Sequence, residues 1–431
     1  MRVLVLGGNG LIGSYVVARL HADGHQVVAL GRNLDAARRR MPWVRWIQAD
    51  LRRMRAHADW AGVIESVDAV VNCAGALQDS PQDDLAAVHV GAAAALYEAC
   101  EKAGIRRVVL ISAAGVAPGR KTRFNDTKLD GEAALRRSGL EWLILRPGLV
   151  LAPSAYGGTA LLRGLAATPG VVALAYPASP VQVVSIDDVA EAVAKALSST
   201  TRPAQTLDLV SPEVTNLQQI VVALRAWLGL KPAPIIVAPD WLAKIAGRAA
   251  DGLSLLGWRS PMRTTSIAQL AAGVTGDSAS VKHGLALEVR SLDALLAAWP
   301  SGVQERWFAR LYFVKPAAIF VLAAFWTASG LIGLIAGFRA AVLALPPLLS
   351  HGAAVGLVVG GSIVDLAIGA GIAVRSTSKI ALQGALLISC AYLIVGTLLR
   401  PDLWNDPFGP LLKILPAALL AIVTLAIMED R

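Results

Sequence analysis

Four long apolar stretches in the C-terminal part of this 431-residue chain constrain its architecture more than any other feature. Each carries at most one charged residue, and each would be roughly 27 to 35 Å long as an α-helix, close to the roughly 30 Å hydrocarbon core of a bilayer. Buried core helices of a large soluble domain are the alternative, but four consecutive stretches and a mean hydropathy of +0.55 favour membrane spans. The sequence therefore predicts four transmembrane helices, at Pro316–Phe338, Gly352–Val374, Ile380–Leu399 and Leu411–Met428.

Charge and cysteine content argue against several functional classes. A net charge of +9 suits either nucleic acid or anionic lipid, and because no zinc-finger, helix-turn-helix or RNP pattern is present, we expect lipid and no nucleic acid. The three cysteines are widely spaced and lack clustered histidines, so we expect neither a disulfide framework nor a metal site. The apolar start, Val3–Leu6, is too short for a secretory signal and predicts a first strand instead.

The opening segment has the strand, glycine turn and helix of a dinucleotide-binding unit. Arg2–Leu6 and Gln26–Leu30 are predicted as buried parallel strands, and the glycines between them have a GxGxxG-like spacing. A helix from about Leu11 would point its N-terminal amides at a pyrophosphate. We therefore expect nucleotide binding at this turn, through Gly7, Gly8, Asn9, Gly10, Leu11, Ile12 and Gly13.

The residues after the second strand favour NADP(H) over NAD(H). An acid at this position holds a ribose 2′-hydroxyl, whereas a base holds a 2′-phosphate. This chain has Gly31 and Arg32 there, and the first acid is Asp35. A solvated loop charge is the alternative interpretation of Arg32, which is the first of eight arginines between residues 32 and 55.

Strands and helices continue to alternate, which is typical of a doubly wound parallel sheet. Beyond about Val150 the pattern becomes mixed and rich in Ala, Leu and Trp. This suggests a lipophilic ligand, but ordinary core packing explains the same composition and is the stronger interpretation. We therefore expect an α/β fold with a Rossmann-type sheet in residues 1–200, a small α+β substrate lobe and connector in 201–311, and an all-α four-helix transmembrane domain in 312–431. The further elements predicted are strands at Val44–Gln48, Ala69–Asn72, Arg107–Ile111, Val181–Ile186 and Thr206–Val210, and helices at Asp84–Lys102, Asp187–Leu197 and around Asn216–Leu228.

Six short segments resemble the successive signatures of the short-chain dehydrogenase/reductase (SDR) superfamily: GGNGLIG, QADL, VNCAG, LISAAG, FNDTK and ILRPG. They are most similar to its atypical branch, which includes the SDR-like accessory subunit of respiratory complex I. The resemblance covers roughly residues 1 to 300. It implies that Asp50 and Leu51 flank the adenine, that Pro147 lies near the nicotinamide, and that three residues after the fourth strand line the cofactor: Cys73, Ala74 and Gly75.

The same resemblance implies catalysis by Ser, Tyr and Lys, with the last two in a YxxxK motif. The serine orients a carbonyl, the tyrosine transfers a proton, and the lysine lowers the pKa of that tyrosine and holds the ribose. Ser112 and Lys128 fit the serine and the lysine, but the tyrosine position is Phe124. A phenyl ring neither donates nor accepts a proton, so the usual acid–base step is missing.

Three residues are candidates for a replacement proton donor, each with a structural alternative. His89 lies on the predicted helix 84–102 and has a suitable ordinary pKa, but a packed or hydrogen-bonded helix residue explains it too. Tyr156 lies in a loop that contacts substrate in relatives, or is simply a loop aromatic. Asp126 lies within FNDTK, where a helix N-cap is the alternative.

The helical C-terminal part resembles the DoxX-like membrane domain found fused to SDR domains, over about residues 312 to 431. Cations and aromatics in residues 306–315 are typical of an interfacial belt before the first span. Asp365 lies in the second span, on a stripe of small residues predicted to pack against a neighbouring helix. It is either a functional site or a protonated acid bonded to a neighbour. The stripe comprises Gly352, Gly356, Gly360, Gly361 and Gly369.

Topology and function follow as expectations. A nucleotide domain must meet the cytosolic cofactor pool and four spans return the chain to the same side, so we expect an integral membrane protein, in the inner membrane if bacterial, with both termini cytosolic. The charges agree: Arg306, Arg310, Lys315, Arg375, Lys379 and Arg431 inside, against Arg339, Arg400 and Lys413 outside. We expect an NADP(H)-dependent oxidoreductase acting on a lipophilic or quinone-like substrate. The alternatives are a cofactor-binding structural or sensing subunit of a membrane complex and, less favoured without the tyrosine, an epimerase.

Overall fold

The computed structural model describes residues 1–346 and 349–428. It divides into two compact units, which we describe separately: residues 1–251 with 260–309, and residues 252–259 with 310–431. The three-part division at residues 200 and 311 stays a prediction. Arg431, counted above among the cytosolic charges, lies outside the described residues.

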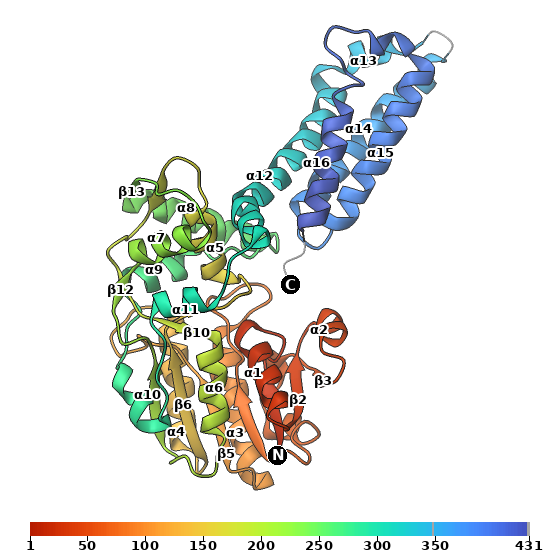
Figure 1. Ribbon diagram of the computed structural model, residues 1–431. Helices are drawn as coiled ribbons and strands as arrows, with labels where there is room; N and C mark the ends of the chain where they lie inside the picture. Colours follow the sequence, from red (N-terminus) through yellow and green to blue (C-terminus); the bar gives the residue numbers. More distant parts are fainter. Residues whose placement is uncertain (347–348, 429–431) are drawn as a thin grey trace. The chain divides into compact units, whose positions relative to one another are not determined.

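The first unit is built on a seven-stranded parallel sheet with the order β11-β6-β5-β4-β1-β2-β3 (Figure 1). This confirms the doubly wound α/β prediction, because the strand order reverses beside β1. The strands are short, and β1, β2, β4 and β5 are almost wholly buried, as expected where helices cover both faces. Their bounds are β1 Arg2–Leu6, β2 Gln26–Gly31, β3 Arg45–Gln48, β4 Ala69–Asn72, β5 Arg107–Ile111, β6 Glu141–Pro147 and β11 Gln205–Leu209.

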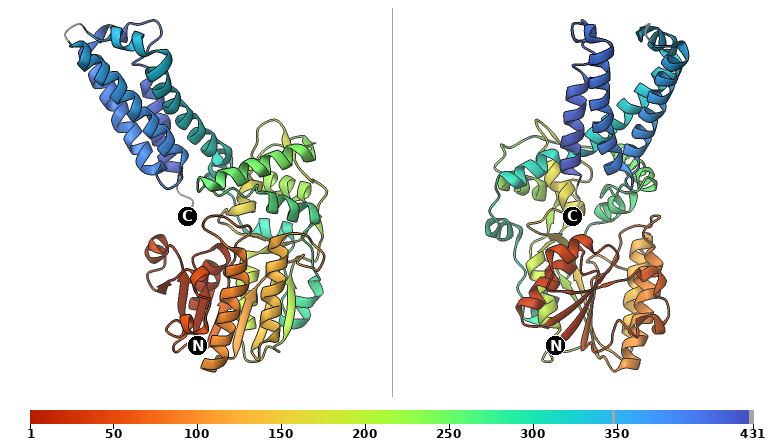
Figure 2. Two further views of the ribbon diagram at one scale, coloured as in Figure 1. Left: turned by 180° about the vertical axis from the view of Figure 1, so that it is seen from behind. Right: turned by 90° about the vertical axis from the view of Figure 1, so that its right-hand side faces the viewer.

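Alternate residues of β1 enter two different cores, which is how one strand supports both helical layers. Val3 and Val5 pack with α1 (Leu11–Ala22) and α6 (Ile186–Ala196), whereas Leu4 and Leu6 pack with α3 (Ala92–Ala103). The right-hand view of Figure 2 shows these helices on opposite faces of the sheet. The remaining helices of this region are α2 Asp35–Arg40 and α4 Arg123–Arg137.

The predicted helix 84–102 is present but begins as a π-helical turn, Ala87–Gly91, before α3. Gly104 closes α3 with a φ of +73°, as the predicted C-cap requires. The predicted strand Val181–Ile186 is split into β9 (Pro180–Val181) and β10 (Val183–Ser185), which pair with different partners. The split lies at Gln182, whose buried amide donates to the Ser211 carbonyl at 2.6 Å.

The first unit also contains a mixed α+β lobe with its own hydrophobic core, built from elements that follow β6 in the chain. Three two-stranded sheets contribute to it, pairing β7 with β10, β8 with β13 and β9 with β12. The bounds not yet given are β7 Leu149–Leu151, β8 Val172–Leu174, β12 Thr215–Asn216, β13 Ile235–Val237, α5 Gly157–Ala166, α7 Leu217–Trp227, α8 Asp240–Leu255, α9 Thr264–Ala272, α10 Ser278–Leu285 and α11 Leu292–Ala298.

The second unit is an all-α bundle. Among the described residues, three helices are long and apolar enough to cross a membrane: Val303–Ala336, which is α12 (Val303–Leu331) with a π-helical end, α14 (His351–Ala373) and α15 (Ser378–Leu399). The predicted fourth span is α16 (Ile414–Ile427), which at 14 residues is roughly 21 Å long. It starts late because Pro416 lacks the N–H that a helix continuing from Leu411 would need. Four spans therefore stay a prediction.

Two details of this bundle add to the expectation. The predicted belt before Pro316 is part of α12, which is helical from Val303 and contains that proline. Only part of the small-residue stripe is at a tight contact. A Cβ added to Gly369 would lie 2.3 Å from the Thr327 hydroxyl, whereas one added to Gly352, Gly356 or Gly360 would meet nothing within 4 Å.

Asp365 lies on the packed side of α14 and is 4% exposed. Its two carboxylate oxygens accept hydrogen bonds from Ser329 of α12 and Tyr392 of α15, each at 2.7 Å. An acid bonded to its neighbours, one of the two interpretations of the sequence, is therefore what the structure shows, and it ties three helices together.

We expect the full-length chain to stay in the membrane fraction through an alkaline carbonate wash, because α12, α14 and α15 bury their apolar surface in lipid. Fractionation of membranes by sedimentation before and after the wash measures this. A fragment ending near Ser301 is the control and should be recovered without detergent. Release of the full-length chain by carbonate would contradict the expectation.

Candidate functional site

The turn between β1 and α1 leaves no room for side chains. Gly7 has a φ of +67°, and a Cβ on Gly13 would lie only 2.1 Å from the Gly7 carbonyl oxygen. The Gly10 amide closes the turn by donating to that same oxygen at 2.8 Å. These residues thus bring α1 against β1 and leave a bare backbone at the carboxyl end of the sheet, as close approach of a pyrophosphate requires.

The N-terminus of α1 has no side-chain cap. Its N-cap residue is Gly10, and the helix begins at Leu11, so the amides of the first turn, including that of Ile12, remain available to an anion. Asn9 does not cap the helix, because its amide donates to the Asn33 carbonyl at 3.0 Å and links the turn to the end of β2.

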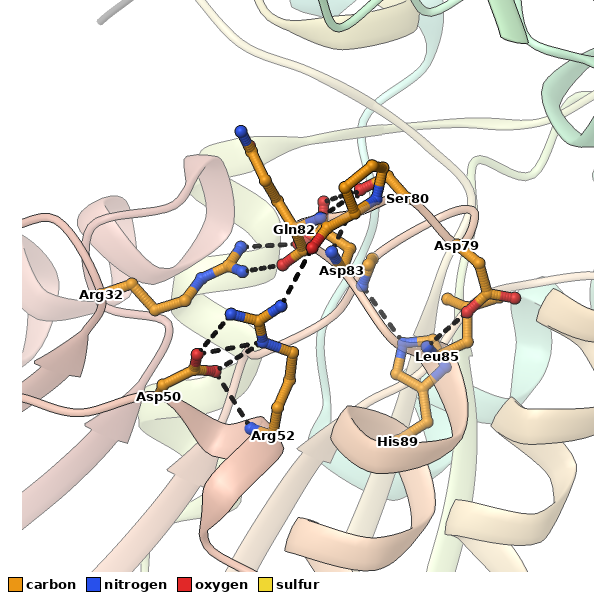
Figure 3. Close-up of polar contacts among 11 residues, drawn as sticks. Arg32, Asp50, Arg52, Asp79, Ser80, Gln82, Asp83, Leu85 and His89 are labelled. Carbon is orange, nitrogen blue, oxygen red and sulfur yellow. Dashed lines mark hydrogen bonds and ion pairs between the residues drawn. The ribbon is translucent and has the colours of Figure 1, made fainter. Parts of the chain in front are cut away.

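The adenosine end of the predicted site is crossed by charged side chains (Figure 3). Arg32 follows β2 and pairs with Asp83 at 2.6 Å, while also donating to the Gln82 carbonyl. Arg52 donates to both carboxylate oxygens of Asp50, and these bonds hold the pKa of Asp50 below its ordinary value. Leu51 is buried beside this pair. Arg32 is therefore an ion-paired residue, and 38% of its side chain is exposed to solvent.

Lys128 and Gly75 meet at the centre of the sheet's carboxyl edge. Lys128 is buried and donates to the Ile111 carbonyl at 3.2 Å. A Cβ on Gly75 would lie 3.4 Å from the ammonium nitrogen of Lys128. Burial lowers the pKa of Lys128 to about 8 and raises the pKa of the neighbouring Cys73 thiol to about 12. Ala74 adjoins them and lines a cavity of about 10 Å³ together with Lys128, about the size of one water.

Pro147 ends β6 at the same edge. Its carbonyl accepts from the Ala114 amide at 2.9 Å, which fixes the end of β6 to the loop after β5. The next residue is constrained as well, because a Cβ on Gly148 would lie 2.4 Å from the Gln182 carbonyl oxygen. The predicted cofactor and catalytic residues at the carboxyl ends of β1, β4, β5 and β6 thus share one edge of the sheet, where ligands of this fold class bind.

His89 is buried in a hydrogen-bond arrangement that suits only the neutral ring. Its Nε2 accepts from the Ala76 amide at 3.2 Å, so Nδ1 carries the proton and donates to Thr127 at 2.9 Å. Burial, reinforced by the charge of Lys128, lowers the pKa of His89 to about 2. The structure thus favours the hydrogen-bonded helix residue over a proton donor.

The other two candidates also lack support as proton donors. Asp126 is not the N-cap of α4, which corrects that alternative: the cap is Thr122, whose hydroxyl accepts from the Asn125 amide at 3.2 Å. Tyr156 immediately precedes α5 and is 43% exposed. Phe124 is partly buried on α4, with its ring edge-on to His89 at a centroid distance of 6.0 Å.

Ser112 is committed to a partner that the sequence did not reveal. Its hydroxyl donates to Glu132 at 2.5 Å, and Glu132 is fully buried. Burial alone would raise the pKa of Glu132, but bonds from Arg146 and Ser112 outweigh it and hold the pKa below its ordinary value. A serine hydroxyl has a single proton to donate, and in Ser112 that proton is hydrogen-bonded to an ionised carboxylate. Ser112 therefore has no proton left to donate to a substrate carbonyl.

The same Glu132 carboxylate also binds Arg136 at 2.8 Å and Arg146 at 2.5 Å. Helical spacing is the one signal in the sequence that could have found it, because Glu132 lies four residues after Lys128 on the same helix. Its partners Ser112 and Arg146 come close to it only in the folded sheet and could not be found from spacing.

Comparisons with known proteins agree with this geometry. Residues 7–200 match the NAD(P)H-binding family and residues 323–422 match the DoxX-like family. The chain joins an NAD(P)-binding, SDR-like Rossmann domain to a DoxX-like domain. The UDP-glucuronic acid 4-epimerase of Bacillus cereus, solved with UDP-glucuronic acid and NAD, shares the fold of this SDR-like region, with a TM-score of 0.52 and 18% identity over 72% of this chain and 100% of that chain.

The matches to curated relatives cover a smaller share of the length of each relative. The NAD(P)H azoreductase of Xenophilus azovorans is 25% identical over 53% of this chain and 74% of its own length. A Photosystem II assembly factor of Synechocystis is 30% identical over 34% of this chain and 44% of its own. Uncharacterized mycobacterial proteins are 26% identical, but the matched region is only 23% of their length.

We expect Glu132→Gln to lower the stability of the SDR-like domain by at least about 2 kcal/mol, because two arginines lose a buried counter-charge. The folded-state pKa lies below the ordinary 4.5, so this stabilisation is complete above about pH 4.5 and disappears as the pH falls through the lower folded value. Thermal unfolding in detergent from pH 7 down to about pH 2 covers this loss and measures both effects.

The matched control is Glu288→Gln, which removes an exposed partner of Lys282 and should change little. Equal destabilisation by the two substitutions, or an unchanged acid dependence in Glu132→Gln, would contradict the role given to Glu132.

Proposed function

We propose that this chain is a membrane-anchored NAD(P)(H)-dependent oxidoreductase whose acceptor is lipophilic and quinone-like. The observation that carries the proposal is a site that keeps its cofactor-binding groups but lacks acid–base groups. The glycine turn and Lys128 remain, while Phe124 replaces the tyrosine and the Ser112 proton is directed at Glu132.

The residues of the turn would hold the pyrophosphate through their amides, and Lys128 would hold the nicotinamide ribose. A bound reduced nicotinamide supplies a hydride. Asp50 and Leu51 would lie by the adenine, and Pro147 by the nicotinamide. In this proposal residues 1–200 bind the cofactor, residues 201–311 form the substrate lobe and connector, and residues 312–431 are the membrane anchor.

The missing acid limits which acceptors this site can serve. A carbonyl that takes up hydride becomes an alkoxide, a strong base that needs a positioned proton donor worth roughly 10²–10⁴-fold in rate. A quinone that takes up hydride becomes a hydroquinone anion, which is a far weaker base than an alkoxide. Its formation therefore does not require a positioned acid, and solvent supplies the proton afterwards. The chain would therefore contribute cofactor binding, orientation and exclusion of side reactions, but no acid. An azoreductase among its relatives supports reductase chemistry.

A lipophilic acceptor also accounts for the DoxX-like domain, because anchoring places the enzyme where such a compound partitions. In this proposal four spans put the SDR-like domain and the C-terminus in the cytosol, with cations on α12 at the inner interface.

A second candidate function is a cofactor-binding subunit of a membrane complex. The same loss of Tyr and of the serine proton favours it, since binding needs neither group. An assembly factor among the relatives supports this alternative.

We expect the chain to bind NADPH more tightly than NADH, because the Arg32 guanidinium adds a charged contact for the 2′-phosphate. Fluorescence titration of both cofactors measures this in the wild type and in Arg32→Ala, which should lose NADPH affinity by roughly fivefold to tenfold and NADH affinity much less. An NADH preference, or equal losses, would contradict the expectation. Arg39→Ala is the control for removing a nearby positive charge.

We expect wild-type chain to oxidise NADPH with a soluble quinone faster than with any of a panel of aldehydes. Phe124→Tyr should raise aldehyde reduction by at least about tenfold, because it restores a proton donor beside Lys128. Phe124→Leu, which changes the ring without adding a hydroxyl, is the control, and Lys128→Ala should weaken cofactor binding.

Rapid aldehyde reduction by the wild type would refute the argument from the missing acid. Cofactor binding without turnover in any variant would favour the binding subunit instead.

A further inference from the structure

We propose that Asp83 sets the cofactor preference of this chain by competing with the 2′-phosphate of NADP(H) for Arg32. The inference rests on the proposed NAD(P)(H)-dependent function, and it concerns a residue outside the glycine turn and outside the ends of β2 and β3. It makes the preference a balance between two anions, one carried by the cofactor and one by the protein.

The segment that carries Asp83 crosses the adenosine end of the site. We call residues Asp79–Asp83 the strap. The strap follows β4, whereas its partners Arg32 and Arg52 follow β2 and β3. Because β1 lies between β4 and β2 in the sheet, the strap must pass over the carboxyl end of β1, where the glycine turn begins. Figure 3 shows the side chains of both arginines directed at the strap.

The strap holds Asp83 in place without help from Arg32. The backbone of Ser80 and Asp83 forms a closed pair of hydrogen bonds, at 2.9 and 3.1 Å. The Ser80 hydroxyl also accepts from the Asp83 amide at 3.0 Å and contacts its carboxylate at 3.3 Å. The Leu85 amide donates to Asp79 at 2.8 Å and fixes the start of the strap. The carboxylate is therefore preorganised at the guanidinium.

The neighbouring arginine, Arg52, directs its hydrogen bonds elsewhere and leaves Arg32 paired with Asp83. Arg52 directs its Nε and Nη2 at Asp50 and its Nη1 at the Pro81 carbonyl at 3.3 Å. A 2′-phosphate at Arg32 must either displace Asp83 or lie beside it, and the second arrangement places like charges together. A 2′-hydroxyl leaves the Arg32–Asp83 pair intact. Asp83 therefore weakens binding of NADPH and leaves binding of NADH nearly unchanged.

The test titrates full-length protein in detergent with NADPH and NADH, and with 2′,5′-ADP and 5′-AMP, which carry the same difference without a nicotinamide. Asp83→Asn keeps the shape of the side chain and removes its charge. We expect it to bind NADPH and 2′,5′-ADP roughly twofold to fivefold more tightly, the range of a partly exposed ion pair, with NADH and 5′-AMP unchanged.

Two further variants separate this effect from general changes in charge or folding. Asp84→Asn removes the adjacent charge, which lies 3.8 Å from Arg55, and should alter neither preference. In the Arg32→Ala background, Asp83→Asn should lose its selectivity for the phosphorylated ligands, because the shared partner is absent.

Equal changes for all four ligands in Asp83→Asn, a weaker affinity for NADPH, or the same selective gain in Asp84→Asn would overturn the inference while leaving the proposed function intact. If no variant, the wild type included, binds any of the four ligands, the proposed function fails and the inference fails with it.

Discussion

The carboxylate of Glu132 is fully buried and joins three elements that hold residues of the candidate site in the SDR-like domain. It accepts a hydrogen bond from Ser112 after β5, binds Arg146 on β6, and belongs to the same helix as Lys128. Leaving such a charge unpaired in the interior would cost several kcal/mol, so its donors are fixed as a group. The position of α4, and with it of Lys128 and Phe124, depends on this carboxylate.

The same interaction links stability to chemistry. A serine positioned for catalysis needs its proton free, but the proton of Ser112 completes the coordination of a buried anion. The structural role and the catalytic role therefore exclude each other for this hydroxyl. Phe124 also lacks a transferable proton, and His89 is held neutral by its own hydrogen bonds. The site therefore has several groups that support cofactor binding, but Ser112, Phe124 and His89 do not support proton transfer.

Periodic features of the sequence predicted the fold well. The short apolar strands, the glycine spacing at residues 7–13 and the C-cap at Gly104 each depend on contacts within a few residues, and each is present. The pairs that define the site were not predictable in this way. Arg32 and Asp83 lie 51 residues apart, and Ser112 and Glu132 lie 20 apart, so only the strand order brings them together. The split at Gln182 depends on a buried amide that hydropathy does not distinguish from a surface one.

In the membrane part, composition predicted α14 and α15 to within two residues, but not the starts of α12 and α16. Proline has opposite consequences in the two places: Pro316 lies inside a continuous α12, whereas Pro416 lies in the first turn of α16. A proline in the middle of a long helix loses one hydrogen bond that its neighbours tolerate, while one near a helix start favours initiation there. Hydropathy treats both residues alike, and so the starts of α12 and α16 differ from the predicted starts at Pro316 and Leu411.

Anchoring and the missing proton donor favour the same class of acceptor under the proposed function. A membrane domain raises the local concentration only of compounds that partition into the bilayer, so a small polar aldehyde gains nothing from it. Loss of the acid costs most for carbonyls and least for acceptors whose reduced form is a weak base. A lipophilic quinone meets both conditions, because it is concentrated at the membrane and its reduced anion takes its proton from water. Neither feature alone selects this class, but an aldehyde satisfies neither condition.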